Sequence, residues 1–541
     1  MPDRPLSLSF PAGGVSRRLG YRDIRRPFTS AWAWNVWNEG QVENRERGGA
    51  RPGLKKANGQ DFGTTIGGIF SARFLDANGA HHYDLYVVAD GKFWVVRNES
   101  ATDTTDSAIL RDVDGNPIQT EAGENITVGV DVSTTVQDAE SSPFTVASYG
   151  NKLYLADSVL KVYDPLTGIV AEVSAAKGSI PTGQTIVSVY RGRIVLSGAD
   201  HVWYASRMND PSDWDFGGEF TDPGRSVVGQ AALAGQIGGV VHALIPHVDQ
   251  HLVIATPSSI HVLRGDFTDG RIDEVSGEIG IIGRSAWAKS PEGAIAFLSQ
   301  DGVYLWQIGS QQAPTRFSEE RVPEQLREID PDTTSVSMAY DVRNRGYHLF
   351  LTPATGDGTH WWLDVERRSM WPVRLTTEHQ PLCAVQHVTE DVMPTVVLGC
   401  KDGYLREFSK DAEDDDGTPY QSHVILGPIR VSGSDDTSGL LSGIRGSFSG
   451  ADVHWRVFGG EDAESVSDEA VAAMDSLIDG GTALAVRAQG VWSGGRSRDS
   501  RTRVRGPWIA ILLSAPTGQW AFENVTVSAR PLGKARIARG A

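Results

Sequence analysis

Short runs of alternating or β-branched apolar residues, closed by tight-turn dipeptides, recur along most of the chain. Clear examples are LYVVADGKFWVV at 85–96, SYGNKLYLAD at 148–157 and YRGRIVLSG at 190–198. Each run predicts two strands and a turn, because side chains alternate between the two faces of a strand. Three Asp-Gly pairs predict type I′ turns, which need positive φ at both central residues: Asp90-Gly91, Asp301-Gly302 and Asp402-Gly403.

The spacing of these hairpins suggests the architecture. They centre near residues 90, 152, 193, 255, 299, 345 and 400, a step of about 50 residues, which is typical of β-propeller blades. We therefore predict an all-β fold containing a propeller of six or seven blades. The polar, Thr/Asp-rich segment 101–128 is predicted to be a long excursion from one blade.

The pattern changes after residue 410. The charged run DAEDDDGTPY precedes further alternating segments between 420 and 529, which predict a β-sandwich-like platform. One helix interrupts them, with Ser467 as its expected cap and Gly480 as its end. The expected organisation is an N-terminal arm (1–56) contributing to platform and docking, a propeller (57–410) and a platform (411–541). The acidic run is predicted to be an exposed linker, because Asp414, Asp415 and Asp416 lack the ligand spacing of a calcium loop.

The N-terminal arm contains the sequence's most distinctive cluster. Three tryptophans lead into a Gly/Arg/Pro turn in AWAWNVWNEGQVENRERGGARPGL at 31–54. Large aromatics beside arginines are typical of interface anchors, so this stretch is a candidate docking surface; the candidates are Trp32, Trp34, Trp37, Arg45, Arg47 and Arg51. The alternative is that the tryptophans pack in the chain's own core.

Charge is unevenly distributed. Residues 1–56 contain 11 Lys/Arg against 5 Asp/Glu, and residues 495–541 contain 9 against 2, which leaves 30 against 61 for residues 57–494. The acidic middle excludes a general nucleic-acid binder there, because duplex affinity comes chiefly from Lys/Arg neutralising phosphates. Acidic surface also simply provides solubility.

The sequence gives little support for a disulfide framework, for a zinc site or for a membrane span. Cys383 and Cys400 are the only cysteines, too few for a disulfide framework and without zinc-ligand spacing, so we expect small core residues in a protein folded in a reducing cytoplasm. Residues 1–26 hold six arginines and no signal-like apolar run. No segment approaches the roughly 18 apolar residues of a membrane span.

No catalytic apparatus can be named. SQDGVYLW at 299–306 lacks one residue of the sialidase Asp-box, and neither a Walker loop nor a Gly-x-Ser-x-Gly elbow occurs. His242, His247, His251 and His261 cluster in sequence, but without a His-Glu-x-x-His helix they predict a hairpin with surface or satisfied histidines. We expect no enzyme, no bound metal and no cofactor.

Several stretches resemble the tail nozzle, or packaged-DNA stabilisation, proteins of short-tailed bacteriophages. They are RERGGARPGL at 45–54, WYASRMNDPSDWDF at 203–216, GEIGIIGRSAWAKSPEGAIAFLSQDGVYLW at 277–306 and GQWAFENVTVSARPLGKARIARG at 518–540. The resemblance implies a structural virion protein that combines a propeller with a β-rich platform. Copies, six in such rings, sit below the portal and adaptor, continue the DNA channel and retain packaged DNA until ejection.

The resemblance also implies partners and a place of action. These are other copies of the chain, the adaptor and portal, tail fibres or spikes, and DNA passing without specific binding, in a virion tail assembled in the host cytoplasm. We predict that basic residues of the two termini, including Arg501, Arg503, Arg505 and Lys534, lie in the platform near the adaptor. Changing Arg47 and Arg51 to Glu is expected to leave the chain folded and to stop incorporation into particles.

Two other functions stay open. A receptor-binding or glycan-degrading tail protein would stack host sugars in a blade groove lined by Trp214, Trp361 and Trp362. A free bacterial propeller would act as a monomeric scaffold. Tryptophans in propellers are more often packing between blades than sugar platforms, so the glycan function ranks second.

Overall fold

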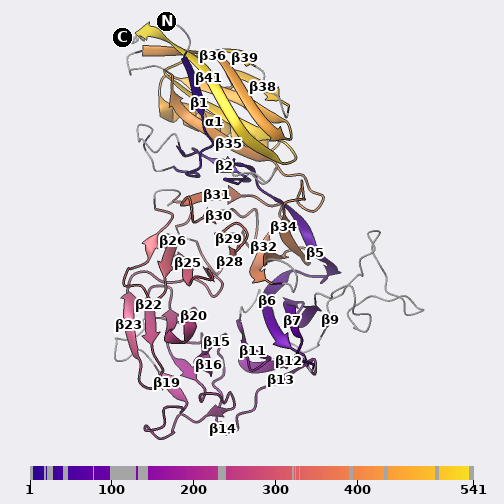
Figure 1. Ribbon diagram of the computed structural model, residues 1–541, viewed down its shortest axis with the longest axis vertical. Coiled ribbons are helices and arrows are strands. Elements are labelled where there is room, and N and C mark those ends of the chain that lie inside the picture. Colours follow the sequence, from indigo (N-terminus) through magenta and orange to yellow (C-terminus); the bar gives the residue numbers. More distant parts are fainter. Residues whose placement is uncertain are drawn as a thin grey trace, which may run out of the picture.

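The computed structural model describes residues 4–17, 20, 28–39, 47–76, 78–97, 130–131, 144–229, 239–319, 322, 324–327, 329–388, 394–431, 437–493 and 499–534. Two β-rich parts lie one above the other along the longest axis of the molecule (Figure 1). Seven four-stranded antiparallel sheets follow one another around a ring in the lower part, and a two-sheet sandwich forms the upper part. The predicted all-β propeller with a sandwich-like platform is confirmed, with seven blades.

Each of the first three blades is built from consecutive strands, apart from one short addition. The first contains β6 (Ile66–Leu75), β7 (His81–Ala89), β8 (Lys92–Arg97) and β9 (Val130–Asp131). The second contains β10 (Val146–Tyr149), β11 (Lys152–Asp157), β12 (Val159–Asp164) and β13 (Ile169–Glu172). The third contains β15 (Ile186–Tyr190), β16 (Arg193–Ser197), β17 (Trp203–Ala205) and β19 (Val227–Gly229), beside the short parallel pair β14 (Lys177–Gly178) and β18 (Asp213–Trp214).

The next three blades repeat this order. The fourth contains β20 (Ala243–His247), β21 (His251–Ala255), β22 (Ile260–Arg264) and β23 (Arg271–Ser276), with the 3-10 turn η3 (Val248–Gln250) inside its first hairpin. The fifth contains β24 (Trp287–Lys289), β25 (Ala294–Ser299), β26 (Gly302–Gln307) and β27 (Thr315–Arg316). The sixth contains β28 (Thr334–Asp341), β29 (Gly346–Pro353), β30 (His360–Asp364) and β31 (Ser369–Val373).

The seventh blade closes the ring with strands from both ends of the propeller sequence. It contains β32 (Pro381–His387), β33 (Thr395–Cys400), β34 (Tyr404–Ser409) and, as its outermost strand, β5 (Gly53–Asp61). Phe408 pairs with Leu54 and Ser409 with Gly53, and β32 also contacts β6 of the first blade. The described propeller strands thus run from Gly53 to Ser409, compared with the expected 57–410.

Turn geometry agrees with only one of the three predicted type I′ turns. Asp90 and Gly91 have φ of 54° and 65° between the paired residues Ala89 and Lys92. Gly302 instead pairs with Ser299, and Gly403 donates its backbone N–H to the carbonyl of Cys400. These two glycines therefore follow the turn instead of forming its centre, and the type I′ prediction is wrong there.

The sandwich consists of two sheets and one helix. One sheet contains β3 (Val36–Trp37), β4 (Gly49–Ala50), β41 (Trp520–Lys534), β36 (Thr437–Gly450) and β39 (Asp499–Arg505), with β1 (Arg4–Leu8) also paired to β41. The other contains β2 (Ala33–Trp34), β35 (Ser422–Arg430), β40 (Trp508–Ala515), β37 (Val453–Gly460) and β38 (Ala488–Trp492). The arm thus supplies strands to both sheets.

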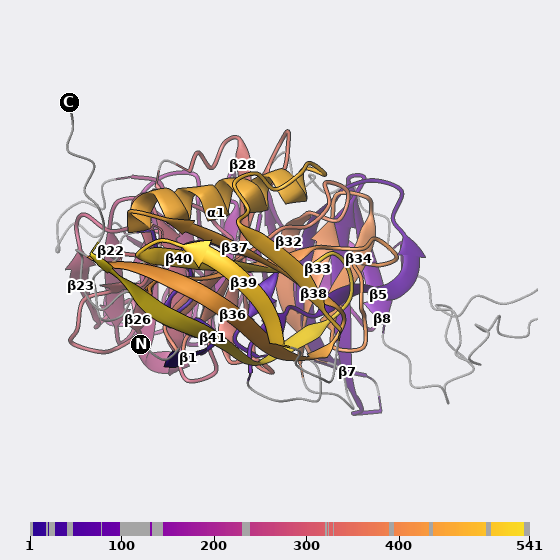
Figure 2. The same cartoon turned by 90° about the horizontal axis from the view of Figure 1, so that it is seen from above.

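Helix α1 (Ala463–Ile478) packs on β35, β37 and β40, so it covers the outer face of the second sheet. Figure 2 shows α1 on one side of the sandwich and β36, β39 and β41 on the other. Asp462 caps the helix by accepting from the backbone N–H of Ser465, whereas Ser467 is buried within it. The prediction of Ser467 as the cap is therefore wrong.

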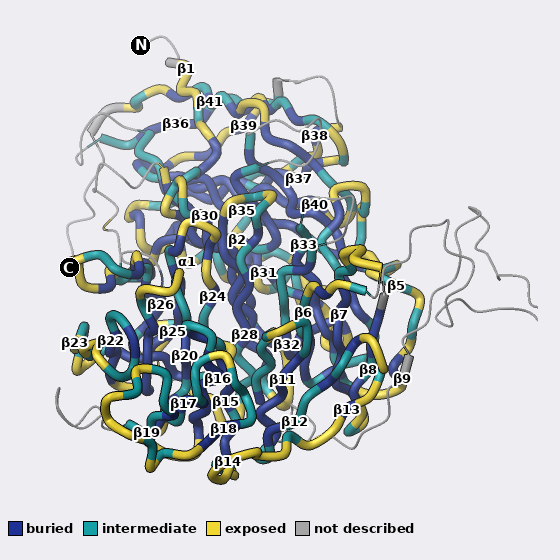
Figure 3. The backbone as a smooth tube through the Cα atoms, turned by 60° about the horizontal axis from the view of Figure 1, so that its bottom comes forward, coloured by how far each residue is buried: buried dark blue, intermediate teal, exposed yellow. Residues whose placement is uncertain are grey.

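Burial follows the strands (Figure 3). One hydrophobic cluster runs from the arm through the fourth to seventh blades into the sandwich, and includes Trp37, Trp362 and Trp520. Cys383 and Cys400 are buried free thiols, as predicted for small core residues. Within the described residues, α1 is the one α-helix, and no helix has both the length and the hydropathy of a membrane span.

Candidate interaction surfaces

The arm tryptophans lie at the junction between the sandwich and the sixth blade. The indole of Trp37 stacks on that of Trp362, with ring centroids 4.9 Å apart. The ring of Trp32 meets Trp361 edge-on at 6.0 Å. Trp32 and Trp37 are 5% and 1% exposed, so the core alternative is correct for both, and their prediction as docking anchors is wrong.

Arg51 occupies the centre of this junction. Its guanidinium donates from Nη1 and Nη2 to the two carboxylate oxygens of Asp415, at 2.8 and 2.6 Å, and both side chains are buried. Nε donates to Oδ1 of Asn35, and the guanidinium carbon lies 4.0 Å from the ring centroid of Tyr420. Burial alone would lower the pKa of Arg51, but the Asp415 carboxylate raises it above its ordinary value. The arginine thus remains charged inside the protein.

This ion pair corrects two predictions. Arg51 contacts its own chain and cannot be an exposed docking residue, because its side chain is fully covered. The acidic run is solvated only in part: Asp411 and Glu413 are exposed, but Asp415 is buried against Arg51 of the arm, and Asp416 pairs with Arg406 of β34 at 2.8 Å. Carboxylates in a like-charge run become buried when buried arginines neutralise them.

The remaining arm candidates differ from one another. Arg47 forms an ion pair with Glu523 of β41. Trp34 is partly exposed and lines a cavity. Arg45 lies outside the described residues. The part of the arm that the structure describes therefore fixes the sandwich to the propeller.

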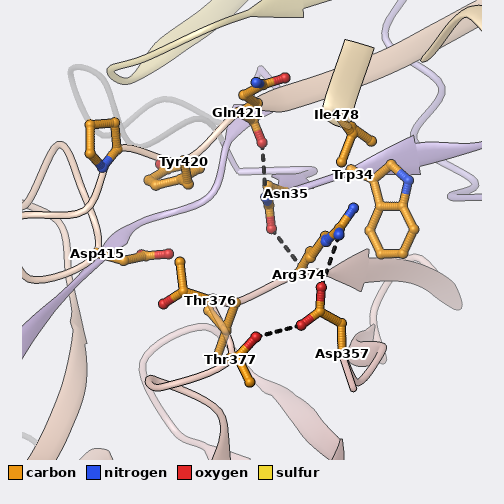
Figure 4. A pocket seen from close by; sticks show the side chains of 12 residues that line it. Trp34, Asn35, Asp357, Arg374, Thr376, Thr377, Asp415, Tyr420, Gln421 and Ile478 are labelled. Carbon is orange, nitrogen blue, oxygen red and sulfur yellow. Dashed lines mark hydrogen bonds and ion pairs between the residues drawn. The ribbon is translucent and has the colours of Figure 1, made fainter. Parts of the chain in front are cut away.

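The cavity beside Trp34 has a volume of about 340 Å³ and lies between the arm, the sixth blade, the linker and α1 (Figure 4). Its charged groups bond to neighbouring side chains: Asp357 accepts from Thr377 at 2.7 Å and from Arg374 at 2.9 Å. These two hydrogen bonds hold the pKa of Asp357 below its ordinary value, and the bond from Thr377 has the larger effect. The arrangement stabilises the junction, and we assign it no chemistry.

The predicted C-terminal arginines do form an exposed group. Arg501, Arg503 and Arg505 are exposed along β39, whereas the intervening Thr502 and Val504 are buried. Alternation along a strand places the three guanidinium groups on one face. Lys534 ends β41 opposite Thr437, but its side chain lies outside the described set. Figure 1 shows β1 and β41, the first and last described strands, side by side in the sandwich.

Two more exposed arginines extend this row onto neighbouring strands. The β36–β39 and β36–β41 registers place Leu440 opposite both Arg505 and Arg530, and Arg445 opposite both Asp499 and Thr526. Arg445 and Arg530 are exposed. We call the solvent side of β36, β39 and β41 the arginine face; its members are Arg445, Arg501, Arg503, Arg505 and Arg530.

The structure does not support the sugar groove of the alternative function. Trp214, Trp361 and Trp362 are 1%, 1% and 3% exposed, so their ring faces are covered by protein and cannot stack on sugars. This part of the glycan prediction is wrong.

The histidine segment forms a hairpin, as predicted. His247 and His251 flank η3 and pair across β20 and β21. Among the described residues, no group of three His, Cys, Asp or Glu side chains is placed to hold a metal ion.

Comparison with known proteins gives similarity of fold. No protein-family model and no curated protein matches the chain. The WD40 β-propeller domain of Doa1 is 12% identical, over 67% of this chain and 97% of that chain, with a TM-score of 0.36. YCF48 bound to D1 peptide is 10% identical, over 67% of this chain and 98% of that chain, with a TM-score of 0.38. U3-55K is 11% identical, over 66% of this chain and 99% of that chain, with a TM-score of 0.37. At such low identity these similarities concern the fold alone.

Proposed function

We propose that the chain is a structural subunit of a short-tailed phage tail nozzle. Several copies form a ring that continues the DNA channel below the portal and adaptor and retains packaged DNA until ejection. The subunit performs no catalysis, and its sandwich end, with the two termini, faces the adaptor. It assembles in the host cytoplasm and acts in the virion tail.

One observation carries this proposal: a single hydrophobic cluster joins the arm, the fourth to seventh blades of the propeller and the sandwich. The arm strands are paired into both sandwich sheets, and β5 continues from the arm into the seventh blade. A subunit that confines DNA under pressure must transmit force without bending, and a continuous core resists bending better than a flexible linker.

The resembling stretches also occupy structurally demanding positions. RGGARPGL contains Arg51 of the junction, WYASRMNDPSDW forms the packed β17–β18 segment, and the final stretch forms β41 in the centre of its sheet. They are therefore stretches whose residues the fold itself constrains. This supports a shared architecture with nozzle proteins.

The proposal is tested by deleting the gene for this chain from its phage and examining the particles. We expect heads that package DNA but then lose it, and that regain retention when the chain is supplied during assembly. Particles that keep their DNA and infect normally without the chain would contradict the proposal.

A further inference from the structure

The arginine face has an unusual composition for a protein of net charge −18. Strands β1, β36, β39 and β41 contain six arginines and one lysine but only two acidic residues, Asp499 and Glu523. Glu523 is paired with Arg47 and accepts from the hydroxyl of Ser449. Within the part of the chain that the structure describes, no ion pair is found for Arg501, Arg503, Arg505 or Arg530.

Protection of a sheet edge does not account for these charges. Charged residues on an edge strand discourage pairing with another chain, and β39 is the last strand of its sheet. However, Arg445 lies on β36 and Arg530 on β41, and both of these strands have neighbours on each side. Glutamates would protect an edge equally well, yet β36, β39 and β41 contain five arginines and one lysine against two acidic residues, Asp499 and Glu523.

We infer that the arginine face binds the phosphate backbone of duplex DNA without reading its sequence. Between the arginines the face carries mostly small or polar residues, including Gly443, Ser528 and Thr526, and one partly exposed leucine, Leu440, between Arg505 and Arg530. A stable protein interface needs large apolar anchors at its centre. Sequence-independent DNA contacts instead use arginines and small polar groups that accommodate phosphate oxygens.

The dimensions suit a duplex. Arg501 and Arg505 are four residues apart on one strand, or about 13 Å, and β39 and β41 are two strand spacings apart, about 10 Å. Duplex DNA carries about one charge per 1.7 Å of axis, so this area can meet about four phosphates. The acidic propeller opposes binding only within about 10 Å of its surface, because salt screens longer interactions.

This inference rests on the proposed function in one respect: the nozzle proposal identifies the duplex as the packaged phage DNA. In a nozzle, the arginine face on the sandwich would bind the duplex, while the acidic propeller would not bind it and would leave it mobile. Retention and release would thus come from different parts of one subunit.

Fluorescence anisotropy with a labelled duplex of about 30 base pairs tests the inference. About four phosphate contacts per chain predict that the wild type binds about 100-fold more weakly at 200 mM than at 50 mM salt. The triple variant Arg501→Gln, Arg503→Gln, Arg505→Gln should bind more weakly than the wild type at 50 mM salt. Between 50 and 200 mM its affinity should fall only about threefold, because about one phosphate contact remains.

The matched control removes three cations from the propeller. Lys177→Gln, Arg271→Gln and Arg345→Gln change side chains that are 70%, 76% and 74% exposed, and this variant should keep the wild-type salt dependence. Equal losses in the two variants, or no wild-type binding at 50 mM, would overturn the inference. Tighter binding of polyglutamate than of duplex would also overturn it, by assigning the face to an acidic protein.

The same variants separate this inference from the nozzle proposal. A β39 variant that still enters particles, together with a wild type that does not bind duplex, would contradict the inference alone. A wild-type chain absent from mature tails would contradict the nozzle proposal, whatever its affinity for DNA.

Discussion

At the scale of single residues, the arm shows what local sequence can reveal. Alternation in AWAWNVW predicts strands, and β2 and β3 are present. The sequence left open whether the tryptophans are buried, because the residues that pack on them lie far away in the chain: Trp361 and Trp362 of the sixth blade. The same holds for Arg51 of the arm and its partner Asp415 of the linker. Nothing within the run DAEDDDG distinguishes Asp415 from its exposed-looking neighbours.

The Arg51–Asp415 pair gives the first prediction. Asp415→Ala leaves a buried guanidinium without its counterion, which costs about 3–5 kcal/mol of the free energy of unfolding. The double variant Arg51→Met, Asp415→Leu removes both charges and should cost clearly less. The matched control is Glu366→Ala, which breaks an exposed pair with Arg345 and should have little effect. Urea unfolding measures all three; an Asp415→Ala variant as stable as the control would contradict this role.

The same pair changes an expectation from the sequence. Arg51→Glu would place a carboxylate against Asp415 inside the protein, so it should unfold the junction instead of leaving the chain folded. A failure of the Arg47→Glu, Arg51→Glu variant to enter particles would therefore say nothing about a docking surface.

At the scale of elements, the repeating hairpins were predictable because each blade is local in sequence, with alternation and turns a few residues apart. Ring closure was not predictable, since β5 pairs with β34 across about 350 residues. The arginine face was predictable only in part. The spacing of Arg501, Arg503 and Arg505 predicts one row of side chains on one face of a strand, but not its extension to Arg445 and Arg530 on neighbouring strands. The junction cavity was not predictable, because its lining comes from distant parts of the chain.

Two glycines of β5 provide a matched test of closure. A Cβ atom on Gly53 would overlap the carbonyl oxygens of Asp414 and Ala412, whereas one on Gly59 would meet no atom within 4 Å. Gly53→Ala should therefore lower Tm by several degrees and expose β5 to proteolysis, and Gly59→Ala should not. Thermal unfolding and limited proteolysis measure this; equal behaviour of the two variants would show that the approach of β5 to the linker is not tight.

At the scale of the whole molecule, negative charge is concentrated in the propeller. The arginine face, β1 and β41 lie in the sandwich, while most acidic residues belong to the propeller. The basic ends and the acidic middle of the chain follow from the sequence counts, but the pairing of β1 with β41, which brings the two basic ends of the sequence into one sheet, required the fold.

Buried histidines make the stability of the whole molecule depend on pH. Desolvation lowers the pKa of His360 and His423 to about 3 and that of His387 to about 4. In the unfolded chain these groups bind protons near pH 6.5, so the unfolded state takes up more protons and stability falls as the pH drops below about 6.5. At pH 5 each histidine should cost up to about 2 kcal/mol.

Urea unfolding at pH 7 and pH 5 measures this dependence. His360→Gln should reduce the difference between the two pH values, whereas His81→Gln, at an exposed position of β7, should leave it unchanged. An equal pH dependence of the wild type and His360→Gln would contradict a neutral buried His360.

Electron cryomicroscopy of purified phage particles, with symmetry determined at the tail, tests the nozzle proposal most directly. We predict a closed ring of this chain at the tail tip, with sandwiches toward the adaptor, arginine faces toward the channel and propellers farther from the head. Particles in which the chain is absent, or present only as isolated copies away from the channel axis, would contradict the account.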